Sequence, residues 1–592
     1  MIFGKHINKF YLKYALLILL GIVALICVDY FQLLIPEIYR NVINGVQNGG
    51  VVSSSGEWLI FNADYVWHQV CVPMFIILVV MVLGRFLWRI CLFGTAIRVE
   101  RDLRKDMFNH CKDLPLDFYH RNKTGQLMSL FISDIDTVQD CFGSGILTLF
   151  DALFLGGLAL YKMFRMSASL TFLSLIPISI MMATSVLLSR KIEHRWDVRQ
   201  EAFSKLSDFS QEIFTGLAVI KAFVREVAEM LNFRKINEQN EVANVDYTKL
   251  NSAWRILITL FVESVICVIL GYGGYLVHKG VFDSGALMEY IGYFTAIVWP
   301  VMAITDLVDL VSRGNASLKR ISDLLNAPLQ IEDKADAVQI DGLRGDVEFK
   351  NLTFSYPGSS TNVLTDVSFS IAAGENVGIV GKTGSGKTTI ADLLLRFYAV
   401  KDGCLFVDGT DVNNVALRSL RNCFAYVPQD NFLFSDTIAN NVAFSDLSAD
   451  SSQIEKYAKI AVVHDDIADF TDGYNTVLGE RGVTVSGGQK QRISIARALI
   501  KDADVLILDD AVSAVDTDTE RTVLDGVRAE RQGKTTIWIA HRISTVENLD
   551  KIVCLDGGKV AAVGTHDQLY ATCPVYKEMV DLQRLDDEKE DA

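Results

Sequence analysis

Positive charge and paired cysteines are both scarce in this 592-residue chain. It has 56 Lys and Arg against 71 Asp and Glu, a net charge of −15 at pH 7. Because nucleic-acid binding needs a basic surface, this balance argues against a nucleic-acid partner. The ten cysteines stand singly, without CxxC spacing. They indicate a reducing compartment or lipid, not a disulfide framework. No repeat of fixed period is present.

Charged residues are few altogether, at 21% of the chain, while hydrophobic residues make up 50%. The mean hydropathy of +0.26 points to insertion in a membrane. Six apolar segments are each close to the ~20 residues that span a bilayer. They are Ala15–Ile35, Val70–Phe93, Phe142–Leu160, Ala168–Leu188, Ile256–Val277 and Leu287–Val311. Charges interrupt three of them, which favours a water-lined bundle.

Basic residues predict how the six spans are oriented. Four follow the second span (Arg98, Arg101, Arg104, Lys105) and four follow the fourth (Arg190, Lys191, Arg195, Arg199). The segment Asn41 to His68, between the first two spans, has no Lys or Arg. By the positive-inside rule, both termini are cytoplasmic and the protein is a multi-pass protein of the cell membrane. Lys162 and Arg165 fall on the outer side, against this rule.

The first fourteen residues predict an amphipathic helix. Ile7, Phe10 and Tyr14 share one face, and Lys5, Lys9 and Lys13 recur on another. This pattern suits a helix that lies in the inner membrane surface. Packing of the apolar face against protein is the alternative. A signal peptide is not indicated, because no small-residue cleavage site follows the apolar run.

Two long charged stretches, Gly94–Cys141 and Ser189–Arg255, are helix-forming in composition and lie on the predicted cytoplasmic side. At ~1.5 Å per residue, the second is long enough for two arms of ~50 Å each. Each stretch contains a turn-like piece, Leu114–Tyr119 in the first and Phe214–Val219 in the second. These pieces are candidate contact points for a soluble domain, or else ordinary turns between helices.

The composition divides the chain into five parts. The amphipathic helix (1–14) is followed by a membrane domain (15–314), and a polar linker (315–344) leads to a soluble domain (345–584). In the soluble domain, strand-like and helix-like segments alternate, as in an α/β domain. The acidic tail, 585–592, is expected to be disordered.

A glycine-rich loop lies between a predicted strand and a predicted helix of the soluble domain. Its residues are Gly381, Lys382, Thr383, Gly384, Ser385, Gly386, Lys387, Thr388 and Thr389. This is the spacing of a phosphate-binding loop. Glycines let successive N–H groups converge on phosphate oxygens, and the helix N-terminus adds partial positive charge. Lys387 is the predicted cation for the β- and γ-phosphates, and Thr388 the hydroxyl for Mg²⁺.

Further motifs surround this loop in the sequence. An apolar strand, Val505–Leu508, ends in Asp509 and Asp510, where an acid is placed to hold Mg²⁺. Ser486, Gly487, Gly488 and Gln489 precede a basic helix. Gln429 follows Val427-Pro428, His541 follows another strand, and Tyr356 ends a third. A buried strand that ends in Asp is common, so the assignment depends on the whole set.

Together with Ser513–Asp516, these motifs occur in an order that resembles that of ATP-binding cassette (ABC) transporters. Because six spans precede them, nearly the whole chain resembles an ABC exporter half-transporter. The resemblance implies a six-span membrane domain of the type IV exporter fold followed by an α/β P-loop ATPase. It also implies ATP and Mg²⁺ as cofactors and two cassettes facing head to tail. Tyr356 would then stack on adenine, Asp509 and Gln429 would serve the metal, and His541 the γ-phosphate. Ser486–Gln489, the signature motif, would serve the partner's nucleotide, and the two turn-like pieces would be coupling helices.

One residue departs from the family pattern. The family usually has Glu after the Mg²⁺ aspartate, to polarise the attacking water, and this chain has Asp510. One methylene fewer withdraws the carboxylate by ~1.5 Å, and an error near 1 Å costs about 10²-fold in rate. We therefore expect a heterodimer whose other chain carries Glu, as in bacterial heterodimeric multidrug exporters. A homodimer with a slower base is the alternative, as is a regulatory or ATP-gated subunit that does not transport.

The cargo and its direction stay open at this stage; the fold is also compatible with import. Acidic residues occur within or near the spans: Asp151, Glu263, Asp306 and Asp309. Intramembrane acids either pair with bases, here Arg85 and Arg89, or recognise a cation. We expect a small molecule, drug, lipid or peptide as cargo.

Overall fold

The computed structural model describes residues 4–52, 58–479 and 485–590. They form two compact units, one from 1–108 and 128–326, the other from 109–127 and 327–592. The short segment 109–127 therefore belongs with the soluble part, although membrane helices flank it in the sequence.

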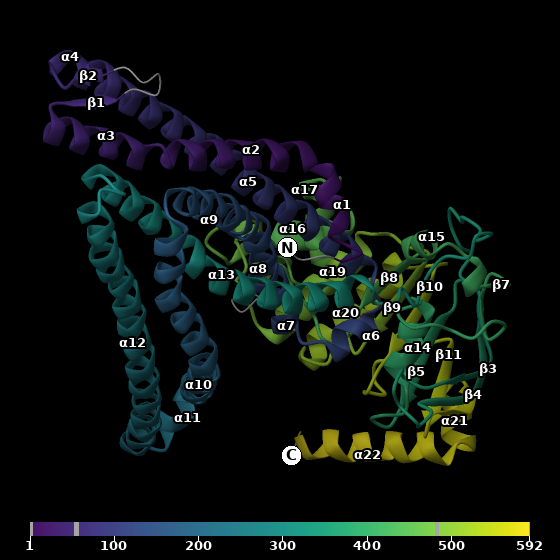
Figure 1. Ribbon diagram of the computed structural model, residues 1–592. Helices are drawn as coiled ribbons and strands as arrows, with labels where there is room; N and C mark the ends of the chain where they lie inside the picture. The colour runs from purple at the N-terminus through teal and green to yellow at the C-terminus, as the bar shows by residue number, and fades with distance from the viewer. Residues whose placement is uncertain (1–3, 53–57, 480–484, 591–592) are drawn as a thin grey trace. The chain divides into compact units, whose positions relative to one another are not determined.

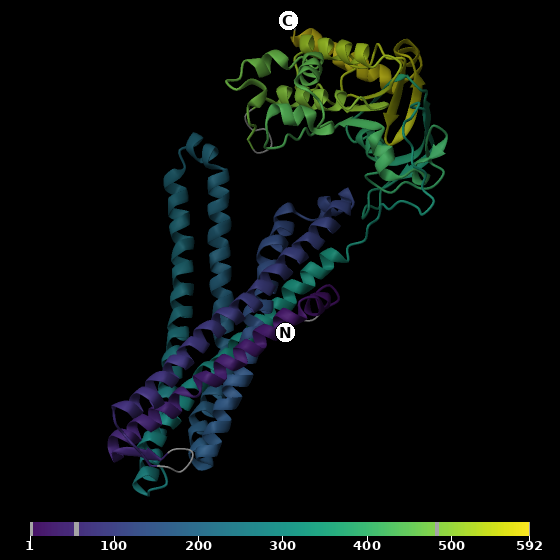
Figure 2. The same cartoon turned by 90° about the horizontal axis from the view of Figure 1, so that it is seen from above.

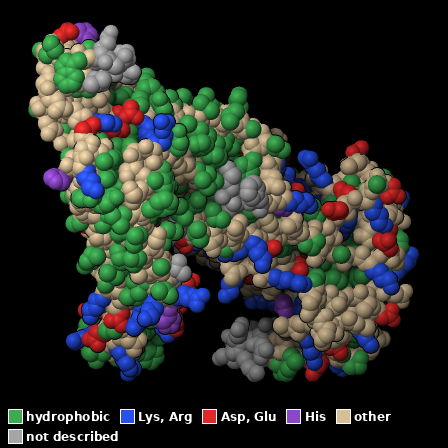
Figure 3. Space-filling view, in the orientation of Figure 1, with side chains coloured by type: hydrophobic (Ala, Val, Ile, Leu, Met, Phe, Trp, Pro, Cys, Tyr) green, Lys and Arg blue, Asp and Glu red, His purple; other side chains and the backbone are tan. Residues whose placement is uncertain are grey.

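The predicted fold class is confirmed, because the described residues contain six helices long and apolar enough to cross a membrane. Three of them combine shorter elements: Ala15–Asn48 comprises α2 (Ala15–Gln32) and α3 (Ile35–Asn48), Ala63–Asp113 ends in α5 (Val72–Asp113), and Thr124–Met166 ends in α9 (Ile146–Met166). The other three are single helices: α10 (Ala168–Thr215), α12 (Glu226–His278) and α13 (Ser284–Leu325). Each predicted apolar segment lies inside one of them. Hydrophobic side chains cover these helices broadly in Figure 3.

The two longest helices, α10 and α12, form a hairpin that ends in the short helix α11 (Leu217–Ala222) (Figures 1 and 2). They contain 48 and 53 residues, which corresponds to about 70–80 Å each. Charged side chains gather at the α11 end of the hairpin (Figure 3). The expected long arms are therefore present, and one turn-like piece is a short helix at their tip.

The apolar face of α1 (Asn8–Lys13) packs against protein. Ile7 is fully buried and Phe10 and Tyr14 nearly so. Lys9 pairs with Asp106 at 2.7 Å, and Lys13 pairs with Asp102. One face of this helix is therefore covered by protein. The sequence pattern could not decide this, because packing and membrane binding need the same amphipathic face.

The polar residues of the membrane helices have partners that the sequence did not identify. Lys162, which violated the positive-inside rule, pairs with Glu37 and donates to the Leu33 carbonyl oxygen at 3.2 Å. Its charge is therefore compensated within the protein. Asp151 accepts a hydrogen bond from Trp299 Nε1 at 2.9 Å, and Asp309 pairs with Arg313 at 3.0 Å.

The other predicted partners and acids lie elsewhere. Arg85 donates to Gln32 at 3.4 Å, and the Arg89 guanidinium lies over the Trp88 ring. Glu263 is exposed and lines an open cleft of α12 with apolar neighbours. Asp306 is exposed as well. Among the described residues, Asp151 thus has the Trp299 indole as a hydrogen-bond donor, and the Arg85 charge acts on it from further away.

Helices extend into the segments predicted as a polar linker and a disordered tail. Helix α13 continues through Leu325, so it covers the first part of the predicted linker 315–344. Leu318, Ile321 and Leu324 recur on one face and are buried, which stabilises the extension. Helix α22 (Pro574–Glu590) covers most of the predicted disordered tail, 585–592. Residues 591–592 lie outside the described residues.

The second unit is built on a six-stranded sheet with the order β12-β11-β5-β10-β9-β8. Its strands are β5 (Asn376–Gly381), β8 (Phe424–Val427), β9 (Val505–Asp509), β10 (Thr535–Ile539), β11 (Lys551–Asp556) and β12 (Lys559–Gly564). All neighbours pair in parallel except β11 and β12. A four-stranded sheet comprises β3 (Val347–Phe354), β4 (Leu364–Ile371), β6 (Leu405–Val407) and β7 (Thr410–Asp411). The observed α/β architecture agrees with the prediction for this part of the chain.

Candidate nucleotide site

The carboxyl ends of the parallel strands bring the predicted site residues together. The glycine-rich loop follows β5, Gln429 follows β8, Asp509 ends β9 and His541 follows β10. These four strands are neighbours in one sheet, and ligands of such sheets bind beyond the carboxyl ends of the strands. Residues from four distant parts of the sequence therefore surround one place.

The glycine-rich loop leads directly into α14 (Lys387–Leu394). Gly384 and Gly386 have φ angles of +81° and +94°, which only glycine adopts at low cost. Lys387 is 6% exposed, and its Nζ donates to the Gly381 carbonyl oxygen at 2.8 Å and the Lys382 carbonyl oxygen at 3.3 Å. Burial lowers the pKa of Lys387, although Asp509 and Asp510 oppose the shift. The lysine is thus fixed over the loop, beside the helix N-terminus.

Two buried polar atoms at this place have no hydrogen-bond partner among the described residues: Ser385 Oγ and Asp509 Oδ2. Unpaired buried polar atoms are rare and call for an explanation. Open space surrounds Gly384 where a Cβ would stand. A phosphate chain over the loop would satisfy Ser385, and a cation would satisfy Asp509. The residues therefore fit ATP with Mg²⁺.

Asp509 is 1% exposed, and burial raises its pKa to about 6, while the nearby Thr388 hydroxyl and Lys387 charge act against that shift. A bound cation stabilises the ionised form of such a buried carboxyl group. Thr388 and Asp509 thus lie together as the metal role requires. Gln429 is exposed at the end of β8.

The backbone of Asp510 is fixed from several sides. Its φ angle is +50°, and its N–H donates to the Ile539 carbonyl oxygen at 2.8 Å. Its own carbonyl oxygen accepts from Gln491 Nε2 at 3.3 Å and Ser513 Oγ at 3.0 Å. Gln491 was not among the predicted site residues. The main chain of Asp510 is therefore held by hydrogen bonds at both its N–H and its carbonyl oxygen.

His541 lies beside the charged groups of the site. Burial and the Lys387 charge lower its pKa, and Asp510 partly opposes them. The imidazole is therefore neutral near pH 7.

Tyr356 lies in the site, but its hydroxyl is already engaged. It hydrogen-bonds Thr389 Oγ1 at 2.9 Å and donates to Asp392 at 3.4 Å, both on α14. The Tyr356 ring packs edge-on against Tyr398, with centroids 4.9 Å apart. The structure thus places the predicted adenine-stacking residue next to the phosphate loop.

The signature motif is placed differently. Ser486 caps α19 (Gly487–Leu499) through a capping box with Gln489. The helix packs with α16 (Ile438–Val442) and α17 (Ser451–Ile460), away from α14 (Figure 1). Ser486 and Gly487 are exposed. The glycine-rich loop and the signature motif therefore do not form one site within this chain.

Comparison with known proteins agrees with this geometry. Residues 18–301 match the family described as "ABC transporter transmembrane region", and residues 364–513 match "ABC transporter". The probable multidrug resistance ABC transporter ATP-binding/permease protein YheI of Bacillus subtilis (strain 168) is 34% identical, over 98% of this chain and 97% of its own length. This chain belongs to the ABC transporter family.

Other relatives of this ABC transporter extend over the same range. The multidrug resistance-like ATP-binding protein MdlA of Escherichia coli (strain K12) is 35% identical, over 97% of this chain and 95% of its own length. The solved structure of a bacterial Atm1-family ABC exporter with ATP bound matches with a TM-score of 0.77 and 26% identity, covering 98% of both chains. The transporter is thus an exporter half-transporter: a multi-pass membrane domain fused to an ATPase domain, which works as a dimer in a lipid bilayer.

One contact links the first turn-like piece of the sequence analysis to the nucleotide site. Helix α6 (Leu116–Arg121) belongs to the soluble unit, and its His120 Nδ1 lies 3.0 Å from the Tyr398 hydroxyl. Tyr398 contacts Tyr356, which in turn bonds to Thr389 of the loop. His120 and Tyr398 were not predicted, since nothing in the sequence relates residues that are 278 positions apart.

We expect Tyr398→Phe to change ATP affinity by less than about twofold and to lower the transport rate about fivefold. A fivefold loss corresponds to one hydrogen bond of about 1 kcal/mol. The aromatic packing stays, and only the His120 contact is lost. Transport by vesicles that contain the complex measures the effect. Tyr474→Phe is the matched control, because it removes another tyrosine–histidine contact of 2.8 Å, to His464. Equal losses in the two variants would contradict a specific role for His120.

Proposed function

We propose that this chain is one half of a heterodimeric ATP-driven exporter whose own nucleotide site hydrolyses ATP slowly. The observation that carries the proposal is the fixed backbone of Asp510, held by Ile539 and Gln491. A carboxylate that is ~1.5 Å too short on a held main chain leaves the attacking water poorly polarised. A partner chain with Glu at this position would supply the faster site.

In this proposal the residues keep the roles implied by the family. Lys387 and the loop N–H groups bind the phosphates, and Tyr356 turns from α14 to stack on adenine. Thr388, Gln429 and Asp509 hold Mg²⁺, which neutralises charge that develops on the phosphates. Neutral His541 donates to the γ-phosphate, and Asp510 orients water. The exposed Ser486 and the N-terminus of α19 serve the γ-phosphate at the partner's site.

Two exposed apolar surfaces support assembly with a second half-transporter. Phe214, Val219 and Phe223, around α11, are 76%, 61% and 74% exposed. On the soluble unit, Phe432, Phe434 and Phe444 form an aromatic cluster that is about half exposed. Apolar groups gathered in this way mark interaction surfaces. We propose that α11 docks on the partner's ATPase domain and that the partner's equivalent helix docks on the aromatic cluster.

We propose that both termini and the ATPase domain lie in the cytoplasm, which the basic residues after the second and fourth spans support. Relatives are named for multidrug resistance, and another, of Syntrophus aciditrophicus (strain SB), is named an ATP-dependent lipid A-core flippase. We propose outward transport of a drug-like molecule, a lipid or a peptide.

Purifying the chain with and without its partner tests the proposal. We expect the chain alone to bind ATP and to hydrolyse it about 10²-fold more slowly than the complex, because its carboxylate is misplaced. Steady-state ATPase rates and ATP-dependent uptake into inverted vesicles are the measurements. Rapid hydrolysis coupled to uptake by the chain alone would refute the heterodimer.

A further inference from the structure

The C-terminal helix α22 contacts the loop that carries His541. The Gln583 side-chain amide makes two hydrogen bonds there. Its Nε2 donates to the His541 carbonyl oxygen at 2.6 Å, and its Oε1 accepts from the Ile543 N–H at 2.7 Å. One side chain therefore holds the main chain on both sides of Arg542.

Gln583 is part of the inward stripe of α22. Tyr576 and Val580, seven and three positions earlier, are 0% and 2% exposed, and this spacing puts the three on one helix face. The Tyr576 hydroxyl also hydrogen-bonds His566 Nδ1 at 2.8 Å. The helix is thus anchored in the core by Tyr576 and Val580. Gln583 is the next residue on the same face, and its side chain contacts the His541 loop.

The same helix reaches the phosphate loop. Glu578 pairs with Lys382 at 3.0 Å, with both side chains more than half exposed. Such a surface pair stabilises little, but it shows where α22 lies. Glu578 and Gln583 thus contact two loops of one nucleotide site, from a helix that no motif of the sequence analysis included.

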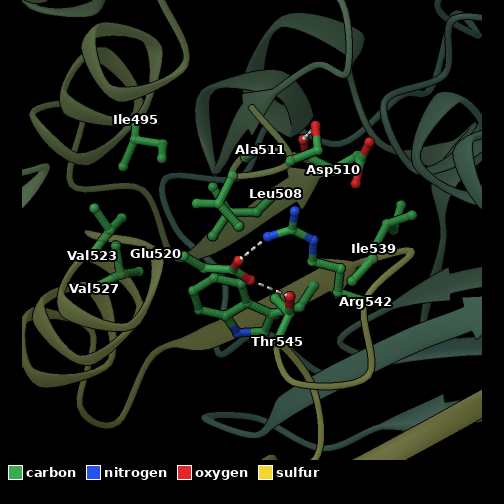
Figure 4. Close-up of a pocket in the computed structure, with 14 residues that line it drawn as sticks. Ile495, Leu508, Asp510, Ala511, Glu520, Val523, Val527, Ile539, Arg542 and Thr545 are labelled. Atoms are coloured by element: carbon green, nitrogen blue, oxygen red, sulfur yellow. Dashed lines mark hydrogen bonds and ion pairs between the residues drawn. The ribbon is translucent and has the colours of Figure 1, made fainter. Parts of the chain in front are cut away.

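The His541 loop is also held from its other side. Glu520, 3% exposed on α20 (Thr517–Glu530), accepts hydrogen bonds from Arg542 Nη1 at 2.8 Å and Thr545 Oγ1 at 2.7 Å (Figure 4). Glu520 holds side chains of the loop, and Gln583 holds its backbone at His541 itself. The His541 imidazole in turn lies close enough to Lys387 and Asp510 for their charges to act on it.

We propose that Gln583 is a positioning residue for His541, which keeps the imidazole in place for the γ-phosphate of ATP. The inference rests on the γ-phosphate role proposed above for His541. Without the two hydrogen bonds the loop shifts, and contacts to the γ-phosphate weaken while those to the α- and β-phosphates stay. The variant therefore discriminates poorly between ATP and ADP.

The test is photolabelling of the purified complex with 8-azido-ATP, read on the gel band of this chain. The ATP or ADP concentration that halves labelling measures each affinity at this site. For Gln583→Met, which keeps the volume, we expect about tenfold weaker ATP competition, the loss of a hydrogen bond to a charged group. For the same variant, the ADP concentration that halves labelling should change by less than about twofold. For the control Gln568→Met, the concentrations of both ATP and ADP should change by less than about twofold. Gln568 lies on another helix, α21 (His566–Thr572), and like Gln583 its side-chain oxygen accepts a hydrogen bond from a backbone N–H, that of Thr565 at 3.1 Å.

Two further variants separate the explanations. His541→Ala should reproduce the selective loss of ATP; if it does not, the proposed role of His541 is wrong. If His541→Ala shows the loss and Gln583→Met does not, the positioning role is wrong. Equal weakening of ATP and ADP by Gln583→Met indicates a general effect on folding and overturns the inference. If Gln583→Met fails to assemble, Gln583→Glu replaces it in the test. This variant keeps the Ile543 contact and loses the donor to His541, and the same two outcomes decide the inference.

Discussion

Asp510→Glu is expected to raise ATP hydrolysis at this chain's own site by about 10²-fold, the cost assigned to a misplacement near 1 Å. The added methylene restores the reach of the carboxylate, while the bonds to Ile539 and Gln491 hold the main chain in place. Steady-state ATPase measurements on the chain purified without its partner detect the gain, because the faster site of the partner is then absent.

Two controls make this result specific. Asp510→Asn keeps the length and removes the charge, so it should give no gain. Adding Lys387→Met to Asp510→Glu should abolish the gain, because the new activity depends on nucleotide at this chain's loop. A rate for the Asp510→Glu chain within twofold of the parent chain, both measured without the partner, would mean that the carboxylate length does not limit hydrolysis.

Lys387→Met is expected to weaken ATP binding at this site by roughly 10²-fold or more, since removing one partner of a buried, hydrogen-bonded charge pair costs about 2–5 kcal/mol. The Lys387 ammonium is buried at the head of α14, where it donates to two loop carbonyl groups and lies near the Asp509 and Asp510 charges. Methionine keeps the stem packed, so the variant tests the charge. Photolabelling of this chain measures the affinity.

Lys382→Met is the matched control from the same loop. The Lys382 side chain is 57% exposed and pairs with Glu578 at the surface, so the change in ATP affinity should stay within about threefold. Equal losses for the two lysines would show that net loop charge, not the position of Lys387, determines binding.

Much of the soluble unit was predictable because its motifs are local. A glycine-rich turn before a helix predicts the phosphate loop wherever it occurs, and four apolar residues before Asp509 predict a buried strand. The six spans were predictable for a similar reason, since about 20 apolar residues in a row have few alternatives.

Other features depended on which element lies opposite. The face of α1 that suits a membrane surface packs against protein, and Lys162 is neutralised by Glu37 from another helix. The end of α13 was predicted as part of a polar linker, but Leu318, Ile321 and Leu324 are buried along one face of the helix. Sequence spacing shows that a face is apolar and does not show what covers it.

The sequence by itself determined the class of protein, the order of its domains and the chemistry of the nucleotide loop, because each is encoded within about twenty neighbouring residues. Only the tertiary structure decided which distant groups meet: Gln491 with the main chain of Asp510, His120 with Tyr398, and Gln583 with the His541 loop. These contacts join residues up to 278 positions apart. Their partners are chosen by the packing of the whole domain, and no local pattern of residue types carries that information.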